Sequence, residues 1–110
     1  MKTAAIVNPR SGGGKTARRW PEIERTLVRR LGPIEVRRTA RPGHAIELAR
    51  ALLEQGFDRI IAAGGDGTIH EAANGFLLDD QPIRPAAALG ILPLGTGGDF
   101  MDQYLTGGGY

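Results

Sequence analysis

The chain contains no cysteine, which excludes disulfide bonds and thiolate metal sites. Histidine is scarce too, and imidazole chemistry rests on His44 and His70 alone. Long apolar runs are also missing. The first run, in MKTAAIVNPRSGGGK, covers about five residues, too short for a signal peptide, and no run reaches the length of a membrane span. These absences predict a cytoplasmic protein whose structure and chemistry do not depend on cysteine.

Charge is small in total but uneven along the chain. The formal net charge is +2; residues 1–50 hold 12 Lys/Arg and 4 Asp/Glu, whereas residues 51–110 hold 2 and 8. Paired arginines such as Arg18 and Arg19 raise the question of nucleic acid or an anionic membrane. No aromatic residues are interleaved with them, so solvated helix faces are the simpler interpretation and no nucleic-acid partner is expected. Any membrane contact is expected to be peripheral, through this basic half.

Apolar patterning predicts alternating strands and helices. Strands are expected at about 3–8, 34–39, 57–63 and 86–94, and helices at about 21–31, 44–55 and from Thr68 or Ile69 to Leu78. Pro21 places the start of the first helix close to it, since proline fits best in a first turn, and Trp20 is expected in the core. This order predicts a single α/β domain over 1–110, a three-layer α/β/α sandwich with a mainly parallel sheet.

Glycine is abundant, with 17 residues, and its clusters follow predicted strands. Gly12 to Gly14, Gly64 to Gly67 and Gly95 to Gly98 come after the first, third and fourth strands, at the edge where open α/β sheets bind ligands. In the stretch IIAAGGDGTIHEAANG, glycine removes Cβ atoms and permits positive φ, so main-chain N–H groups can converge on a phosphate. The following helix directs its positive end to the same place.

Two better-known phosphate motifs do not fit. RSGGGKT lacks the first glycine of a P-loop, since that position is Pro9. Gly12-x-Gly14-x-x-Ala17 resembles a dinucleotide fingerprint, but the second strand ends in Arg38 and Thr39 where that fold needs an acid for the ribose. A flexible surface loop remains an alternative for this segment taken alone.

Asp66 needs a separate explanation, because a carboxylate beside a phosphate is repulsive. Mg²⁺ bound to carboxylate and phosphate oxygens offsets the repulsion, which favours metal-assisted phosphoryl transfer over passive anion binding. A turn in which Asp66 caps the helix is the alternative. LPLGTGGDF repeats the glycine, threonine and aspartate pattern one strand later, so the two loops together predict a two-walled phosphate cleft.

Four motifs in order resemble one family. NPRSGGGK (8–15), T-x-x-x-GHA-x-x-LA (39–49), GGDGTIHEAANG (64–75) and GILPLGTGGDF (90–100) resemble the diacylglycerol kinase catalytic-domain family, which includes bacterial lipid kinases and the sphingosine and ceramide kinases. The GGDGT loop is shared with NAD kinases and resembles the phosphofructokinase nucleotide loop. The resemblance implies transfer of the γ-phosphoryl group of Mg·ATP to a lipid hydroxyl such as that of diacylglycerol.

The resemblance also implies site residues. Asp66 is similar to the family's catalytic or metal-linked acid. The positions that match nucleotide contacts are Asn8, Ser11, Gly12, Gly13, Gly14, Lys15, Thr39, Gly64, Gly65, Gly67, Thr68, Glu71, Asn74, Gly95 and Thr96. Gly98 stands where the family has asparagine, which removes a side-chain amide from that wall. His44 falls in the loop before a helix and His70 on the exposed side of one, and neither is expected to be catalytic.

Family members continue into a β-rich domain with lipid-binding surface, and residues 1–110 match only the nucleotide-binding half, so that domain is expected to be absent. Two alternatives stay open: a non-catalytic nucleotide-binding or assembly module, and an NAD kinase-like enzyme. Apolar surface left by a missing domain would favour a homo-oligomer.

Overall fold

The computed structural model describes residues 1–94, and the predicted loop with Gly95, Thr96 and Gly98 lies outside the described residues. The elements are β1 (Thr3–Val7), a 3₁₀ helix η1 (Ser11–Gly14), α1 (Lys15–Leu31), β2 (Ile34–Arg38), α2 (His44–Glu54), β3 (Arg59–Gly64), α3 (Asp66–Gly75), β4 (Leu77–Leu78), β5 (Gln81–Pro82) and β6 (Ala88–Pro93). Their order confirms the predicted alternation of strands and helices.

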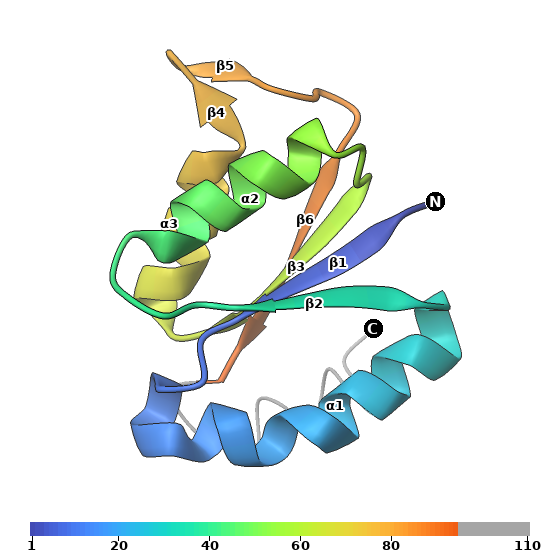
Figure 1. Cartoon of the computed structure of the whole chain (residues 1–110), viewed down its shortest axis with the longest axis vertical. Helices are drawn as coiled ribbons and strands as arrows, with labels where there is room; N and C mark the ends of the chain where they lie inside the picture. The colour runs from blue at the N-terminus through green and yellow to red at the C-terminus, as the bar shows by residue number, and fades with distance from the viewer. Residues whose placement is uncertain (95–110) are drawn as a thin grey trace.

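Four strands form one parallel sheet in the order β2-β1-β3-β6. Figure 1 shows α1 on one face of this sheet and α2 with α3 on the other, which confirms the three-layer sandwich. Because the strands are parallel, β1, β2 and β3 all end at one edge, which we name the carboxyl edge. We name the opposite edge, where they begin, the amino edge.

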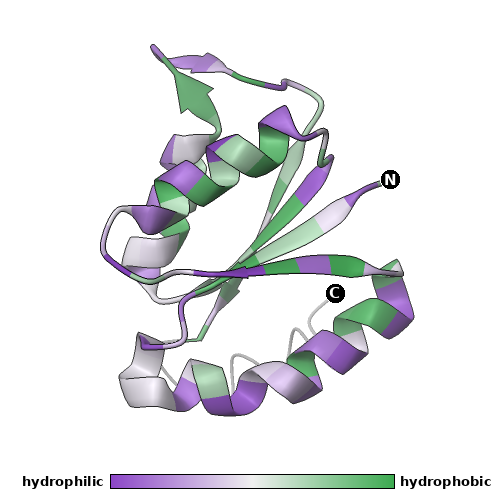
Figure 2. Ribbon diagram, in the orientation of Figure 1, coloured by the Kyte–Doolittle hydropathy of each residue, from purple (hydrophilic) through white to green (hydrophobic). Residues whose placement is uncertain are grey.

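Side chains of β1 and β3 alternate between two apolar cores. Every residue of β1 is buried, as expected for a strand covered on both faces. The core under α2 and α3 contains Ala4, Ile6, Ala45, Ala49, Leu52, Leu53, Phe57, Ile60, Ala62 and Ala72. The core under α1 contains Ala5, Val7, Trp20, Ile23, Ile61, Ala63, Leu92 and Leu94, which confirms Trp20 as a core residue. In Figure 2 the hydrophobic colour follows the inner strands, and α1 alternates between polar and apolar residues.

Small residues let α2 and α3 lie close together. A Cβ atom on Gly75 would lie 2.6 Å from the carbonyl oxygen of Ile46 and 2.7 Å from the Cβ of Ala49. Glycine at this position therefore makes room for α2, although a glycine inside a helix weakens it. This close approach holds the C-terminal end of α3 against α2.

Two predicted helix boundaries were wrong. Helix α1 begins at Lys15, so Pro21 lies inside it rather than in its first turn. Pro21 is exposed, and the buried residues Trp20 and Ile23 next to it hold the helix against the sheet despite the lost hydrogen bond.

Helix α3 begins at Asp66, earlier than predicted, and ends at Gly75. The β4–β5 hairpin replaces its predicted last turn, and its two-residue turn has positive φ at Asp79 and Asp80.

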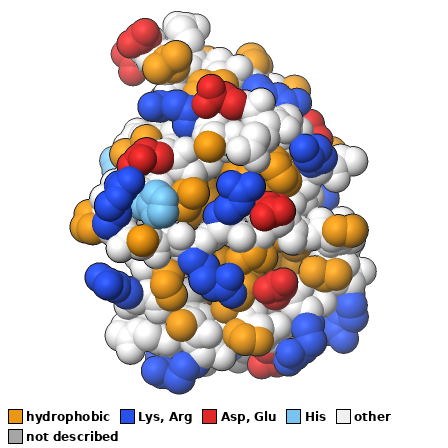
Figure 3. All heavy atoms as spheres, in the orientation of Figure 1, with side chains coloured by type: hydrophobic (Ala, Val, Ile, Leu, Met, Phe, Trp, Pro, Cys, Tyr) orange, Lys and Arg blue, Asp and Glu red, His pale blue; other side chains and the backbone are white. Residues whose placement is uncertain are grey.

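None of the helices within residues 1–94 is long and apolar enough to cross a membrane. On the face drawn in Figure 3, Lys and Arg side chains are spaced among apolar and other groups rather than gathered into one patch.

Candidate functional site

A cleft lies at the carboxyl edge, where β1, β2 and β3 end. Its volume is about 240 Å³, and it is lined by Asn8, Arg10, Thr39, Ala40, Arg41, Pro42, Gly67, Thr68 and Glu71. These residues come from the segments after β1 and β2 and from the first turns of α3. The volume is slightly below the range of sites that enclose a whole small-molecule ligand, so the cleft suits part of such a ligand.

Asn8 joins two walls of the cleft. Its Nδ2 donates a hydrogen bond to the Oγ1 of Thr68 at 2.9 Å, and its Oδ1 accepts one from the main-chain N–H of Arg10 at 3.0 Å. The side chain therefore fixes the chain after β1 against the start of α3. Since Asn8 supplies the hydrogen bond that Thr68 accepts, the Thr68 hydroxyl proton remains available for a ligand.

Ser11 holds the loop that precedes α3. Its Oγ accepts a hydrogen bond from the N–H of Gly65 at 3.0 Å. A Cβ atom on Gly64 would lie 2.9 Å from this Oγ, 3.0 Å from the Thr68 Oγ1 and 3.1 Å from the Asn8 Cβ. The absence of a side chain at Gly64 therefore makes room for three side chains of the protein. The expectation that it clears space for a phosphate is wrong at this position.

The first turn of α3 faces the cleft through Gly67 and Thr68. The first helical hydrogen bond of α3 runs from the N–H of Ile69 to the carbonyl of Gly65 at 3.2 Å, so the N–H groups of 66–68 precede the helical ladder. Nothing lies within 4 Å of the place where a Gly67 Cβ would be. This turn combines open space, N–H groups and the positive end of a helix, as an anion site requires.

Positive φ occurs in the loop after β1 rather than at Gly65 and Gly67. Gly65 has a φ of −81° and an extended backbone, and Gly67 is helical, so neither uses the positive φ that glycine permits. Gly12, Gly13 and Gly14 do have positive φ, at 63°, 66° and 93°. These three glycines turn the chain from β1 into α1.

Asp66 is exposed at the first position of α3, beside the cleft rather than in its lining. Within residues 1–94 there is no group of three or more His, Cys, Asp or Glu side chains that could hold a metal. Mg²⁺ commonly uses one or two carboxylates and takes its other ligands from phosphates and water. Asp66 directly precedes Gly67, which borders the open anion site. Its exposed carboxylate is therefore suited to be one of the protein ligands of Mg²⁺.

Residues 39–43, which we name the 39–43 loop, form the wall after β2. The Nδ1 of His44 accepts a hydrogen bond from the N–H of Ala40 at 2.9 Å, and the Oε2 of Glu71 accepts one from the N–H of Gly43 at 3.0 Å. Gly43 has a φ of 83° and is the N-cap of α2. Two side chains from different helices therefore hold the main chain of this loop.

Arg41 brings a cation to the same wall. Its guanidinium makes a two-pronged contact with the carboxylate of Glu47, at 2.7 Å and 3.0 Å, and both side chains are exposed. The hydrogen bond from Arg41 lowers the pKa of Glu47, and the same bond raises the pKa of Arg41. With Arg10 across the cleft, the lining carries two guanidinium groups and the Glu71 carboxylate.

The predicted contacts fall into four groups. Asn8, Thr39, Gly67, Thr68 and Glu71 line the cleft. Ser11, Gly64 and Gly65 lie behind that lining, whereas Gly12, Gly13, Gly14, Lys15 and Asn74 are not part of it. Gly95 and Thr96 lie outside the described residues.

Sequence reasoning missed Arg10, Ala40, Arg41 and Pro42, which line the cleft, and the hydrogen bond made by His44. Arg10 lies within the motif NPRSGGGK and could have been found there. Ala40, Arg41 and Pro42 are not fixed positions of any motif. They lie next to α3 because β1 pairs in parallel with β2, which the sequence alone does not reveal.

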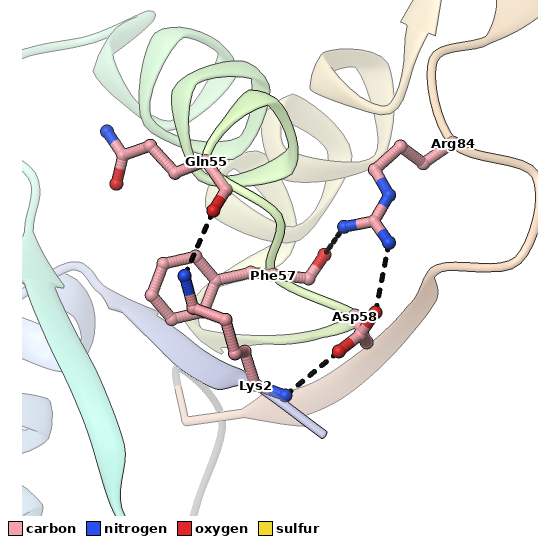
Figure 4. Close-up of polar contacts among 5 residues, drawn as sticks. All are labelled: Lys2, Gln55, Phe57, Asp58 and Arg84. Atoms are coloured by element: carbon pink, nitrogen blue, oxygen red, sulfur yellow. Dashed lines mark hydrogen bonds and ion pairs between the residues drawn. The ribbon is translucent and has the colours of Figure 1, made fainter.

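A second polar cluster lies at the amino edge and is drawn in Figure 4. Asp58 accepts a hydrogen bond from the main-chain N–H of Lys2 at 2.9 Å and pairs with Arg84 at 3.0 Å. Arg84 also donates to the carbonyl of Phe57 at 2.9 Å, and the Lys2 Nζ lies 4.5 Å from the centre of the Phe57 ring. The hydrogen bond from Lys2, followed by that from Arg84, lowers the pKa of Asp58.

Comparisons with known proteins point to one family. The family model described as "Diacylglycerol kinase catalytic domain" matches residues 2–107. The chain is 42% identical over 95 residues to a diacylglycerol kinase of Staphylococcus haemolyticus, covering 86% of this chain and 28% of that protein. It is 43% identical over 90 residues to a probable lipid kinase YegS-like protein of Chromohalobacter salexigens, covering 79% and 28%.

A solved structure gives the same result. The crystal structure of a diacylglycerol kinase from Bacillus anthracis matches with a TM-score of 0.70 and 31% identity, over 86% of this chain and 33% of that one. The predicted fold and family resemblance are thereby confirmed. The chain spans about a third of the length of these relatives.

Proposed function

The chain belongs to the diacylglycerol kinase catalytic-domain family, and from this premise we propose that its carboxyl-edge cleft binds Mg·ATP for phosphoryl transfer to a lipid hydroxyl. The observation that carries the proposal is the open first turn of α3 at Gly67 and Thr68, in a cleft that also contains Arg10 and Arg41. Helix N–H groups and guanidinium groups are the donors that phosphate oxygens require.

Each wall has its own task in this proposal. Gly67 and Thr68 bind phosphate oxygens, the first through its main chain and the second through its hydroxyl. Thr39, with the rest of the 39–43 loop, contacts the nucleoside from the opposite wall. Arg10 offsets the phosphate charge, which reduces the repulsion that the nearby Asp66 and Glu71 carboxylates exert.

The reaction is a transfer of one phosphoryl group. The lipid hydroxyl oxygen bonds to the γ-phosphorus, the bond from that phosphorus to the β,γ-bridging oxygen breaks, and ADP leaves while the hydroxyl proton is released to a base. Mg²⁺, when bound, would supply charge neutralisation. Asp66 would hold the metal, and the donors of α3 hold the phosphates in line.

The acceptor and the place of action follow from the relatives as proposals. Relatives named diacylglycerol kinase and lipid kinase favour a lipid acceptor such as diacylglycerol. ATP is a cytoplasmic phosphoryl donor, so we place the reaction in the cytoplasm, at the surface of the membrane that holds the lipid.

Titration calorimetry with Mg·ATP tests nucleotide binding. The protein is expected to bind ATP in the presence of Mg²⁺ and to lose affinity when EDTA removes the metal. Gly67→Val should impair binding, because its side chain would fill the open space at the first turn of α3. Asp66→Asn should weaken the dependence on Mg²⁺ while the fold, followed by circular dichroism, stays unchanged, since this carboxylate is exposed.

Lipid phosphorylation is tested separately. The protein is incubated with γ-labelled ATP and vesicles that contain diacylglycerol, and label in phosphatidic acid is measured, with vesicles lacking diacylglycerol as the control. Labelled lipid supports the proposal. Binding of Mg·ATP without lipid labelling would show that residues 1–110 alone do not transfer the phosphoryl group to diacylglycerol, and no Mg-dependent binding would contradict the site itself.

A further inference from the structure

The 39–43 loop is one wall of the cleft and connects β2 to α2. It contributes Thr39, Ala40, Arg41 and Pro42 to the lining. It is anchored at its start, where the N–H of Thr39 donates to the carbonyl of Val7 at 2.9 Å. Beyond that point the carbonyl groups of Arg41 and Gly43 accept hydrogen bonds from the N–H groups of His44 and Ile46, both at 3.2 Å. The N–H groups of Ala40 and Gly43 are held instead by two side chains, which belong to α2 and α3.

His44 closes the loop on itself. Its Nδ1 accepts the N–H of Ala40 at 2.9 Å, across four residues. The bond fixes the turn in which Arg41 and Pro42 face the cleft, just before α2 begins. Only an acceptor at the Nδ1 position can make it, because the partner is a main-chain donor.

Glu71 ties the same loop to the opposite wall. Its Oε2 accepts the N–H of Gly43 at 3.0 Å, over a sequence separation of 28 residues, and the contact is partly buried. Glu71 and Thr68 both lie on α3 and both line the cleft. The bond therefore sets the spacing between the turn that carries Thr68 and the loop that carries Thr39.

We propose that His44 and Glu71 are positioning residues that hold the 39–43 loop in its ligand-binding position through these two main-chain hydrogen bonds. The inference rests on the proposed function for its effect on nucleotide affinity, but the hydrogen bonds themselves are independent of it. A loop that is ordered before binding loses less conformational entropy when the ligand arrives, so affinity rises.

Four variants separate positioning from direct contact. His44→Ala and Glu71→Ala remove the acceptors. His44→Asn keeps an oxygen close to the Nδ1 position, and Glu71→Gln keeps an amide oxygen that can accept from Gly43 but removes the charge. His70→Ala is the matched control, since His70 is the chain's other histidine, on the exposed side of α3.

Amide hydrogen exchange measured by NMR on the protein without ligand tests the hydrogen bonds. Exchange at Ala40 should accelerate in His44→Ala, and exchange at Gly43 in Glu71→Ala, with wild-type rates in the asparagine and glutamine variants. His70→Ala should leave both amides unchanged. Unchanged exchange in both alanine variants would overturn the proposal, whether or not the protein binds nucleotide.

Mg·ATP titration tests the consequence. Each alanine variant should raise Kd by about fivefold to tenfold, the equivalent of one lost hydrogen bond. His44→Asn and Glu71→Gln should recover Kd to within about twofold of the wild type. If Glu71→Gln binds as weakly as Glu71→Ala, Glu71 acts through its charge and its positioning role is wrong. If the wild type itself binds no nucleotide, the proposed function fails, and the exchange rates still decide whether the two residues hold the loop.

Discussion

The two edges of the sheet both carry polar clusters, but the clusters differ in what they leave available. At the amino edge, Asp58 is paired with Arg84 and with the N–H of Lys2, so its charge is used within the protein. At the carboxyl edge, Asn8, Ser11 and Glu71 hold main-chain N–H groups, while Asp66 has no ion-pair partner among residues 1–94. A polar cluster alone therefore does not identify a site.

What separates the edges is the geometry around glycine. At the carboxyl edge, Gly64 is crowded by three polar residues, and three positions later Gly67 borders open space. Crowding behind the cleft and space within it are both needed for a rigid, open anion site. The amino edge has an open depression of about 350 Å³ near Lys2 and Phe57, larger than the cleft at the carboxyl edge, but no helix begins there.

Gly64→Ala should produce the largest change, because it disrupts the packing of the side chains that lie behind the cleft. The added methyl group would displace Ser11 and Thr68, at an expected cost of about 1–3 kcal/mol in the free energy of unfolding. Mg·ATP affinity should fall as well. Urea unfolding and calorimetry measure the two effects. Wild-type stability would show that this crowding does not define the edge.

Asp58→Asn should weaken the interactions of Asp58 with Lys2 and Arg84 at the amino edge and leave the cleft unchanged. The pKa of Asp58 is lowered in the folded protein, so its carboxylate stabilises the fold above its unfolded-state pKa of about 4 and loses that effect as pH falls below it. The variant should be less stable than the wild type at pH 7 and similar to it near pH 3, with unchanged Mg·ATP affinity.

Glu54→Gln, which neutralises an exposed carboxylate at the end of α2, is the control for Asp58→Asn and should have little effect at either pH. A stability difference for Asp58→Asn that stays constant from pH 7 to pH 3 would contradict the assigned role of Asp58.

Gly67→Ala should separate stability from binding within the carboxyl edge. Alanine in the first turn of α3 meets no atom within 4 Å and favours helix, so unfolding should become harder by about 0.5–1 kcal/mol. The same methyl group enters the cleft and should weaken Mg·ATP binding. A more stable variant with undiminished affinity would indicate that the ligand lies elsewhere.

The double change Asp79→Asn and Asp80→Gly should have the smallest effect. Both residues have positive φ, at 51° and 63°, in a two-residue hairpin turn where Asn-Gly is preferred. Thermal unfolding should show a slightly higher Tm, because Asn and Gly adopt positive φ more readily than Asp. Affinity for Mg·ATP should not change, since the hairpin follows the far end of α3, and a change in affinity would contradict the separation of the two edges.

The fold was readable from local pattern. The all-buried run at β1 and the 3.6-residue spacing of Ala45, Ala49 and Leu52 predicted a parallel sheet with covering helices, and the structure has them. Pro21 misled the prediction because packing of Trp20 and Ile23 outweighs one missing hydrogen bond. The β4–β5 hairpin was missed because Leu77 and Leu78 continue the apolar spacing of α3 in the sequence. In the structure α3 ends at Gly75, and these two residues form β4.

The site was only partly readable. Thr39, Gly67 and Thr68 were assigned from motifs, and they line the cleft. Their exact roles, and the assignment of Asp66, stay predictions. Motif spacing could not reveal that Ser11 and Glu71 bind main-chain groups of distant loops, because those contacts span 54 and 28 residues and exist only after the strands pair.

Mapping of Mg·ADP by amide chemical shifts tests the central claim most directly. The account predicts saturable shifts at the carboxyl edge, at Arg10, Thr39, Gly67 and Thr68, with the amides of Lys2, Asp58 and Arg84 unmoved. Shifts concentrated at the amino edge, or no saturable shifts at either edge, would contradict it.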